Sequence, residues 1–538
     1  MKREQWKSQF GFLLAAVGSA IGLGNIWRFS YMAHEHGGGA FLIPYIVALL
    51  TAGIPLLILE FGLGHERIGS APLAYAKINR KWEWLGWWSV IFVMFGINLY
   101  YTVIISWCIN FFVLSFDLGW GTDPESFFFE EFLQISNSPS EIGQTRTPIL
   151  IGVIFVWFFN WIIVYRGVQK GIEMANKIFM PLLLALTTFL VFWSLSLEGS
   201  MAGIRYYLTP EYHILKDPKV WIAAYSQIFF TLSLGFGIMI AYASYLPKKS
   251  DLTKNAFLTA FINSGFSIFA GFAVFSVLGF MSTLQGEPIS DLIRQDSGIA
   301  FVAYPKALSL MPAGNLFGAI FFLSLVIAGV SSSISIIEAF SAAAIDKFGI
   351  NKKKFVTILC VLGMLGSIVF TTQGGLFWLD IVDHFLSHYG LIVVGIAECI
   401  LVGWIFNLEV LRRHINKVSS IKLGVWWDAL IKYFIPLILS IILIGDLYTE
   451  LREPYGDGGY SWASLILIGR DWVLLTLVAG IVFALQPWKT ELLDQGKDRD
   501  ASEAEKTPEG RDLQKTPHKG RKKYKSLRDF VKRTFGAL

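Results

Sequence analysis

The sequence has little charge and little cysteine for its length. Asp, Glu, Lys and Arg make up only 16% of its 538 residues. About a quarter is usual in soluble domains, so an ordinary soluble protein is excluded. There are 3 cysteines. All of them, Cys108, Cys360 and Cys399, lie in apolar runs, and we therefore expect free buried thiols and no disulfide.

The common motifs of membrane enzymes and ATP-driven pumps are also missing. His34-Glu-His36 is too short for the His-Glu-x-x-His zinc motif, and Gly445-Asp446 lacks the preceding glycine of an intramembrane aspartyl protease. No glycine-rich phosphate-binding loop is present, which argues against an ATP-driven pump. We therefore expect neither an enzyme nor a primary pump.

What the sequence has instead is apolar length. Hydrophobic residues make up 54% of the chain and aromatic residues 15%, and apolar runs long enough to cross a bilayer recur throughout. We predict an all-α polytopic membrane protein with twelve transmembrane helices. They are expected near residues 10–32, 41–64, 88–116, 148–165, 174–197, 219–245, 256–284, 314–345, 355–371, 376–407, 430–449 and 472–487.

Lys and Arg gather in alternate connections between these spans, beginning with Lys2, Arg3 and Lys7 before the first span. The positive-inside rule places those connections in the cytoplasm, so both termini are expected to be cytoplasmic. The charged N-terminus runs into a long glycine-broken segment without a small-residue cleavage site, so no cleavable signal peptide is expected. Basic loops and a basic tail account for the net charge of +5, and no nucleic acid partner is expected.

The chain changes character after Pro487. Residues 488–538 are dense in charged residues and are expected to form a cytoplasmic tail, separate from a transporter domain at 1–487. Within it, Lys522 to Leu538 mixes basic and apolar side chains. This stretch is either a surface helix on anionic lipid or a plain solvated tail.

The first span contains residues that a membrane helix rarely tolerates. Gly18, Gly22, Gly24, Asn25 and Arg28 interrupt an otherwise apolar segment. Glycine favours a break, and any backbone group freed in hydrocarbon must find a partner inside the protein. A helix broken at mid-membrane offers carbonyls to a cation and N–H groups to a carboxylate. The run therefore indicates an ion-coupled transporter.

The sixth span is interrupted in the same way, by Phe229 to Gly237. Two broken spans separated by five helices are typical of inverted repeats with the binding site at their interface. We place the repeats at about 8–198 and 219–408. The last two helices, at about 430–487, lie outside them.

Four segments carry a family resemblance. They are Gly18 to Arg28, Gly37 to Tyr45, Gln227 to Gly237 and Ala328 to Ser333. They closely resemble the neurotransmitter:sodium symporter family, especially its prokaryotic amino-acid transporters, and the resemblance extends to about residue 487. It implies the 5+5 inverted-repeat fold of the bacterial leucine transporter, with helices 1 and 6 unwound.

The function that the resemblance implies is sodium-coupled import of a neutral, apolar amino acid by alternating access, across the cell membrane. The short connection at 117–147 lacks cystines, and Asn137-Ser-Pro is blocked for glycosylation, which points to a prokaryote. The alternative is a non-transporting amino-acid sensor on the same fold. The oligomeric state is left open.

Two sodium sites are implied as well, and neutral oxygen ligands suit such a hard cation. The first would use the Ala20 carbonyl, the Asn25 and Asn263 side chains, the Thr231 carbonyl and hydroxyl, and a substrate carboxylate oxygen. The second would use the Gly18, Ile21 and Ala328 carbonyls with the Ser331 and Ser332 hydroxyls. Taken alone, the serines from Ser331 to Ser333 favour a small-residue seam for helix packing. Beside the broken first helix, we favour the ion site.

The substrate pocket follows by the same resemblance. N–H groups near Leu23 and Gly24, with the Tyr101 hydroxyl, would hold the carboxylate. Gly22 stands where family members that carry amines without a carboxylate place Asp, so an α-amino acid is favoured. The ammonium would meet carbonyls of Ala20, Phe230 and Thr231 with Ser233 nearby, and the side chain would lie among Ile97, Tyr101, Phe230, Phe236, Ser332 and Ile336.

Chloride dependence is the remaining question about the ions. Chloride-dependent relatives bind the anion with Tyr, Gln, Asn and Ser side chains, whereas independent prokaryotic members often supply a Glu from the seventh helix. The positions here are Tyr45, Gln227, Thr231, Asn263 and Ser267. Since Ser267 replaces the acid, we predict chloride stimulation.

Two gates are implied by charged residues near the site. Arg28 and Asp383 resemble the outer pair, which closes over the substrate, with Phe230 and Tyr101 as an aromatic lid. Arg3 and Asp346, with Trp6, resemble the inner pair. Charges near mid-membrane are costly unless they are paired or wet, so opening and closing against water is a sensible use of them. Static pairing or snorkelling is the alternative.

Overall fold

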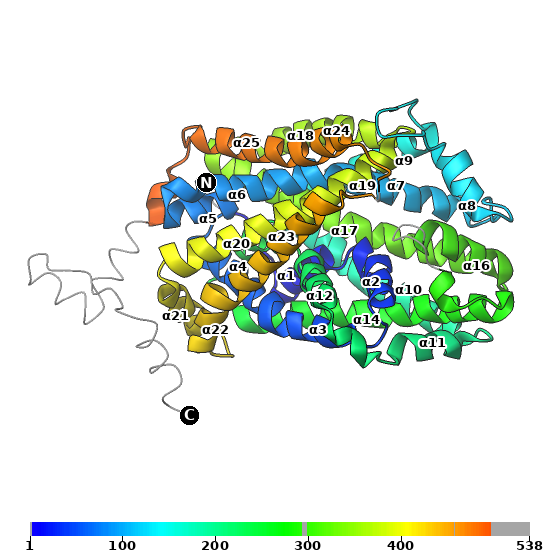
Figure 1. Ribbon diagram of the computed structural model, residues 1–538. Coiled ribbons are helices and arrows are strands. Elements are labelled where there is room, and N and C mark those ends of the chain that lie inside the picture. Colours follow the sequence, from blue (N-terminus) through cyan, green and yellow to red (C-terminus); the bar gives the residue numbers. More distant parts are fainter. Residues whose placement is uncertain (1–2, 293–298, 457, 497–538) are drawn as a thin grey trace, which may run out of the picture.

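The apolar runs of the sequence form long helices in the computed structural model, which describes residues 3–292, 299–456 and 458–496 (Figure 1). Within these ranges there is no β-strand, only the isolated bridges Gly38–Pro210 and Thr145–Thr372. The predicted alternatives for Lys522 to Leu538 lie outside the described residues. Cys108, Cys360 and Cys399 are buried and free, as expected.

Most of the longer helices are apolar segments, and several of them continue through a π-helical turn. The α-helices are α1 Gln9–Ala20, α2 Trp27–Glu35, α3 Leu42–Ala48, α4 Ile54–Arg67, α5 Ala71–Ile78, α6 Glu83–Ile91, α7 Asn98–Leu114, α8 Pro124–Ser126, α9 Thr147–Tyr165, α10 Met174–Leu195, α11 Ser200–Leu208, α12 Pro218–Thr231, α13 Ile238–Ala243, α14 Leu252–Gln285, α16 Tyr304–Leu310, α17 Gly314–Phe348, α18 Lys352–Ser367, α19 Gly375–Phe385, α20 Leu391–Ile400, α21 Leu408–Val418, α22 Val425–Ala429, α23 Ile435–Arg452, α24 Trp462–Ser464 and α25 Asp471–Leu485.

The predicted membrane spans correspond to these helices. In the described part of the chain, 10 continuous helices are long and apolar enough to cross a membrane, and the pair Gln9–Ala20 and Leu23–Glu35, bent by 73°, makes 11. The sixth predicted span is also helical, as α12 and α13 with residues 232–237 between them. The all-α polytopic fold with two unwound helices is therefore confirmed.

The span edges differ most from the prediction at the third span, expected to begin at residue 88, and at the twelfth, expected to begin at residue 472, whose helix begins at Trp462. The third span shows the reason. The continuous helix runs from Arg80 to Leu114. Its first turns carry Arg80, Lys81 and Glu83, whose charges hide a helical segment from a search for apolar runs. The helix also passes through a π-helical turn, Phe92–Ile97, which hydropathy cannot reveal.

Polar residues begin several helices at the end of the bundle that carries the N-terminus. The Ser8 hydroxyl accepts a hydrogen bond from the Gly11 N–H. Asp251 and Asn351 cap α14 and α18 in the same way. Each cap satisfies a backbone donor that the helix itself cannot bond. These residues therefore set where the helices start.

The broken helices lie inside the bundle, where neighbours can satisfy the freed backbone. α1 packs against α10, α14 and α17, and α13 packs against α4 and α17. In the second break, Ser233, Gly235 and Gly237 all have positive φ, so the segment cannot continue a right-handed helix. The Gly235 N–H donates to Glu60 Oε1 at 2.7 Å. A side chain of α4 thus stabilises the unwound turn.

The two ends of the described chain meet at one end of the bundle. Lys489 and Glu491 line the same cavity as Arg3 and Glu4, and its volume is about 940 Å³. In Figure 1, the N-terminus, α5 and α21 lie at the left, and α8, α11 and α16 lie at the right. An even number of spans would bring the two ends together in this way.

Candidate functional site

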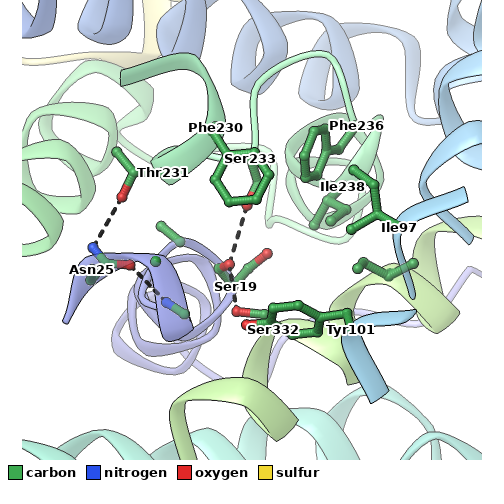
Figure 2. Close-up of a pocket in the computed structure, with 14 residues that line it drawn as sticks. Ser19, Asn25, Ile97, Tyr101, Phe230, Thr231, Ser233, Phe236, Ile238 and Ser332 are labelled. Carbon is green, nitrogen blue, oxygen red and sulfur yellow. Dashed lines mark hydrogen bonds between the residues drawn. The ribbon is translucent and has the colours of Figure 1, made fainter. Parts of the chain in front are cut away.

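A small cavity of about 40 Å³ lies where the two broken helices face α7 and α17 (Figure 2). Most of the residues predicted to hold substrate line it, and none of its lining residues is charged. The lining consists of Ser19, Ala20, Gly22, Gly24, Asn25, Ile97, Tyr101, Phe230, Thr231, Ser233, Phe236, Ile238, Ser332 and Ile336.

Asn25 connects the first break to the second. Its Oδ1 accepts a hydrogen bond from the Gly22 N–H at 2.8 Å. Its Nδ2 lies 3.0 Å from Thr231 Oγ1, 2.8 Å from Asn263 Oδ1 and 2.8 Å from Ser267 Oγ. An amide has two hydrogens, so it cannot saturate all three oxygens at once. The surroundings of Asn25 are therefore rich in oxygen.

Three main-chain carbonyls predicted to bind sodium have no hydrogen-bond donor among the described residues: those of Gly18, Ala20 and Thr231. α1 ends with the bond from the Ile21 N–H to the Val17 carbonyl. α12 ends with bonds to the carbonyls of Ile228, Phe229 and Phe230 instead. A buried carbonyl without a partner is costly. A cation at these oxygens would remove that cost.

The residues of the second predicted sodium site also lie together. Ser331 Oγ donates to the Ala328 carbonyl at 2.8 Å, and Ser332 Oγ lies 3.4 Å from the Ile21 carbonyl. The Ser19 carbonyl accepts from Ser332 at 3.1 Å and from Ser233 at 3.2 Å (Figure 2). These hydroxyls join α17 and the second break to the end of α1.

The side of the cavity near Tyr101 is suited to a carboxylate. The Leu23 N–H donates to the Tyr101 hydroxyl at 3.2 Å, whereas the Leu23 side chain does not line the cavity. A Cβ built on Gly22 would lie 2.8 Å from the Tyr101 hydroxyl and 3.0 Å from Ser332 Oγ. Only glycine fits at position 22 without displacing these groups.

Aromatic rings cover the cavity beside the second break. The rings of Phe230 and Phe236 meet edge to face, with centroids 6.2 Å apart. The Arg28 guanidinium lies 4.5 Å from the centre of the Phe230 ring. Arg28 therefore sits directly at the predicted lid.

The residues predicted to bind chloride are all buried, and their side chains are polar. Both polar atoms of the Gln227 amide lack a hydrogen-bond partner in the described structure. The Tyr45 hydroxyl donates to Ser264 Oγ at 3.1 Å, and Ser267 Oγ donates to the Asn263 carbonyl at 3.3 Å. A buried, unpartnered amide with hydroxyls nearby offers the donors that an anion requires.

The inner pair is formed. Arg3 Nη1 lies 2.7 Å from Asp346 Oδ1, and the same guanidinium donates to Ser244 Oγ. The Trp6 indole N–H donates to the Tyr242 carbonyl at 2.8 Å. Burial alone would lower the pKa of Arg3, but Asp346 and further acidic neighbours raise it above its ordinary value. Arg3 therefore stays charged against its partner.

The outer pair is not formed: no ion pair joins Arg28 to Asp383 among the described residues. Asp383 Oδ1 instead accepts from the Tyr100 hydroxyl at 2.5 Å and from Ser387 Oγ at 3.2 Å. The structure thus holds the inner pair together and the outer pair apart.

The sequence did not reveal some residues of this region. Ser19 and Ile238 line the cavity. The Tyr100 hydroxyl donates to Asp383, and the Ser244 hydroxyl accepts from Arg3. Ser19 lies inside the glycine-rich run, which was the available signal. The other three lie in ordinary apolar stretches, so only their packing identifies them.

A polytopic bundle with two helices broken at one uncharged, oxygen-lined cavity is the architecture of a secondary transporter. The model of the "Sodium:neurotransmitter symporter family" matches residues 3–125 and 121–489. The chain belongs to this family, and it is a sodium-dependent membrane transporter, not an enzyme.

Several relatives are similar over most of their length. An uncharacterized sodium-dependent transporter of Methanocaldococcus jannaschii is 49% identical over 491 residues, which are 91% of this chain and 99% of that protein. The sodium- and chloride-dependent GABA transporter 2 of Bos taurus is 32% identical over 80% of this chain and 77% of its own. The sodium-dependent dopamine transporter of Caenorhabditis elegans is 30% identical over 90% and 85%.

Proposed function

We propose that this protein is a symporter that imports a neutral, apolar α-amino acid together with sodium. The observation that carries the proposal is the cavity between the broken helices, which has no charged lining residue. A zwitterion brings both of its charges to such a site, where free backbone groups and a hydroxyl can meet them. An uncharged lining leaves no partner for a charged side chain.

Two sodium ions complete this proposal. The first binds the Ala20 and Thr231 carbonyls with the side chains of Asn25, Thr231 and Asn263. The second binds the Gly18, Ile21 and Ala328 carbonyls with the Ser331 and Ser332 hydroxyls. The carbonyls of Gly18, Ala20 and Thr231, which lack donors in the described part of the chain, support both. Sharing the substrate carboxylate with the first ion would couple the two ligands.

The driving force is sufficient. Each sodium ion gains roughly 2.3 kcal/mol per 100 mV of membrane potential and about 1.4 kcal/mol per tenfold gradient. Two ions therefore supply about 7 kcal/mol, enough to accumulate substrate on the order of 10⁵-fold.

Chloride belongs to the same proposal as a stimulating ion. Two sodium ions with a zwitterion leave positive charge that is uncompensated, and Ser267 supplies no carboxylate. The unpartnered Gln227 amide and the hydroxyls near it support an anion there. Relatives named as sodium- and chloride-dependent transporters favour this reading.

We further propose that both termini are cytoplasmic, that the protein resides in a prokaryotic cell membrane, and that the repeats span about 8–198 and 219–408 within a transporter domain at 1–487. The basic connections and the shared position of the chain ends support the orientation. Arg3 and Asp346 then form the cytoplasmic gate, and Arg28 and Asp383 the external gate.

The test is uptake of radiolabelled amino acids into proteoliposomes, with an inward sodium gradient and with choline in its place. Sodium-dependent accumulation of an apolar amino acid is expected. Asn25→Ala should lower uptake at least about 100-fold, because the hydrogen bonds of Asn25 join both breaks. Ser30→Ala is the matched control, since Ser30 bonds only to its own helix, at the Ile26 carbonyl.

The alternative function, an amino-acid sensor, predicts a different outcome. A sensor would bind substrate more tightly in sodium but would not accumulate it inside the vesicle. Sodium-enhanced binding without accumulation would overturn the symporter and support the sensor.

A further inference from the structure

Two histidines of the tenth span face two carboxylates of the eleventh. His384, on α19, lies 2.9 Å from Glu450 Oε2 through its Nε2, and His388 Nδ1 lies 3.0 Å from Asp446 Oδ2. Both partners are on α23. The histidines are four residues apart and so are the carboxylates, so each pair stacks one helical turn above the other.

The pairs are partly enclosed. The side chain of His384 is 13% exposed and that of His388 is 37% exposed. The His384 ring stacks on Tyr455, with centroids 3.7 Å apart and planes at 11°. The two imidazoles are themselves stacked, at 4.8 Å. His388 is therefore the more exposed of the two, while aromatic packing fixes His384.

Acidic groups dominate the surroundings. Asp380 accepts hydrogen bonds from Tyr455 at 2.9 Å and Tyr460 at 2.7 Å, and the Tyr389 hydroxyl lies 3.5 Å from Glu450. The titratable and charged groups on the elements that pack here are Lys219, Tyr225, Asp380, Asp383, Tyr389, Glu398, Cys399, Lys432, Tyr433, Asp446, Tyr448, Glu450, Arg452, Glu453, Tyr455, Tyr460, Arg470 and Asp471. Arg470 is engaged with Asp471. Carboxylates are therefore the nearest charged partners of both histidines.

The pairs are connected to the external gate through the chain. His384 directly follows Asp383, and Ser387, which donates to Asp383, directly precedes His388. Asp383 is held by Tyr100 and Ser387, while Arg28 lies over Phe230. To reach Arg28, Asp383 must leave these donors. Any movement of its backbone segment toward Arg28 would also displace both histidines relative to α23.

We propose that the His384–Glu450 and His388–Asp446 pairs form a proton-binding site that controls closure of the external gate. Histidine gains its charge between about pH 5 and 8. When the two histidines are protonated, both pairs are ion pairs, and they hold α19 against α23 in the arrangement that keeps Arg28 and Asp383 apart. When the histidines are neutral, each pair keeps at most one hydrogen bond, and the segment that carries them moves more easily. External acid thus slows closure.

The first test is the pH dependence of thermal unfolding, which needs neither substrate nor flux. The full chain in detergent is compared with His384→Gln/His388→Gln at pH 5.5 and 7.5. Acid should stabilise the natural protein relative to the variant, so that the Tm difference grows by about 3 °C or more between the two pH values. The single variant His388→Gln, at the more exposed position, should show part of this growth. A Tm difference independent of pH overturns the site.

The second test rests on the symport function proposed above. Initial sodium-driven uptake is measured at external pH 5.5 and 7.5 with the internal pH fixed. The natural protein should slow at least about threefold in acid, and His384→Gln/His388→Gln should not. His388→Lys, with a permanent charge, should be slow at both pH values. The control His213→Gln changes an exposed histidine outside the cluster and should follow the natural protein.

Equal slowing of all four proteins in acid would overturn control by these histidines. If no protein shows sodium-dependent uptake at any pH, the symport function fails instead, and the unfolding measurements still decide whether the proton site exists.

Discussion

At the scale of single residues, the candidate site depends on backbone groups and on the absence of a side chain at glycine. The backbone of Gly18, Ala20 and Thr231 presents oxygens, and Gly22 leaves room for Tyr101 and Ser332. The glycines and Asn25 could be predicted to matter because they are improbable inside a membrane helix. The sequence could not predict which carbonyls lack hydrogen-bond donors, since that depends on where each helix ends.

Gly22→Asp should abolish uptake of amino acids. Its side chain would enter the space 2.8 Å from the Tyr101 hydroxyl and would repel the substrate carboxylate. Uptake should fall at least about 100-fold, and Gly22→Ala should fall less, because it adds only a methyl group. The control is Gly445→Ala, where an added Cβ meets nothing closer than Ile222 Cδ1 at 3.9 Å. Normal uptake by Gly22→Asp would contradict the assignment.

Ser267→Glu should remove chloride dependence. The new carboxylate would take the place of the anion beside Asn25 and Asn263, within the polar group that already surrounds Ser267. Replacing chloride with gluconate should slow the natural protein several-fold and leave the variant unchanged. If gluconate changes neither protein, chloride has no role here.

At the scale of helices, hydropathy located the 11 spans that the described residues form by length and composition, and the glycine-rich runs located both breaks. Arg28 and Asp383 could be predicted as a pair, but not as a pair held apart, because the sequence does not specify which conformation of the protein is stabilised. The histidine pairs were also missed. Their partners are 66 and 58 residues away, and only the packing of α19 on α23 brings them together.

Lys77, on the short helix α5 beside the Arg3–Asp346 pair, should make stability depend on pH. Burial, and then the nearby Arg3, lower the pKa of Lys77 to about 8. Between about pH 8 and 10.5 the unfolded chain binds a proton here that the folded protein does not, so stability rises with pH across this window. Lys77→Met should flatten that rise in Tm. Lys81→Met, at an exposed lysine, should not. A slope unchanged in Lys77→Met would refute the assignment.

At the scale of the whole molecule, a buried ion pair, Lys347–Glu83, stabilises the end of the bundle that carries the termini. Lys347 Nζ lies 2.5 Å from Glu83 Oε1, and neither side chain is more than 2% exposed. Trp488, after the last span, donates to Glu83 Oε2 at 2.9 Å. One carboxylate therefore connects α6, α17 and the chain beyond α25.

Lys347→Met should be destabilising, since it removes the buried cation of Glu83 and leaves only the half-exposed Arg80, whose Nε lies 3.3 Å from Glu83 Oε2. A cost of about 3 kcal/mol is expected, seen as a fall in Tm in detergent. The double variant Glu83→Gln/Lys347→Met should recover most of that loss. Arg413→Met, which breaks the exposed pair with Glu409, should cost less than about 1 kcal/mol. A double variant no better than the single one would show that charge burial is not the cause.

The break between α12 and α13 also constrains how the protein is made. α13 has only 6 residues, far fewer than a bilayer crossing requires, so this half-span cannot remain in lipid by itself. The unwound residues 232–237, which precede α13, are stabilised by Glu60, whose carboxylate accepts a hydrogen bond from the Gly235 N–H. Glu60 belongs to the second span, which leaves the ribosome long before the sixth. The order of synthesis therefore delivers the acceptor first, and the sixth span becomes a membrane segment only by docking onto helices already inserted.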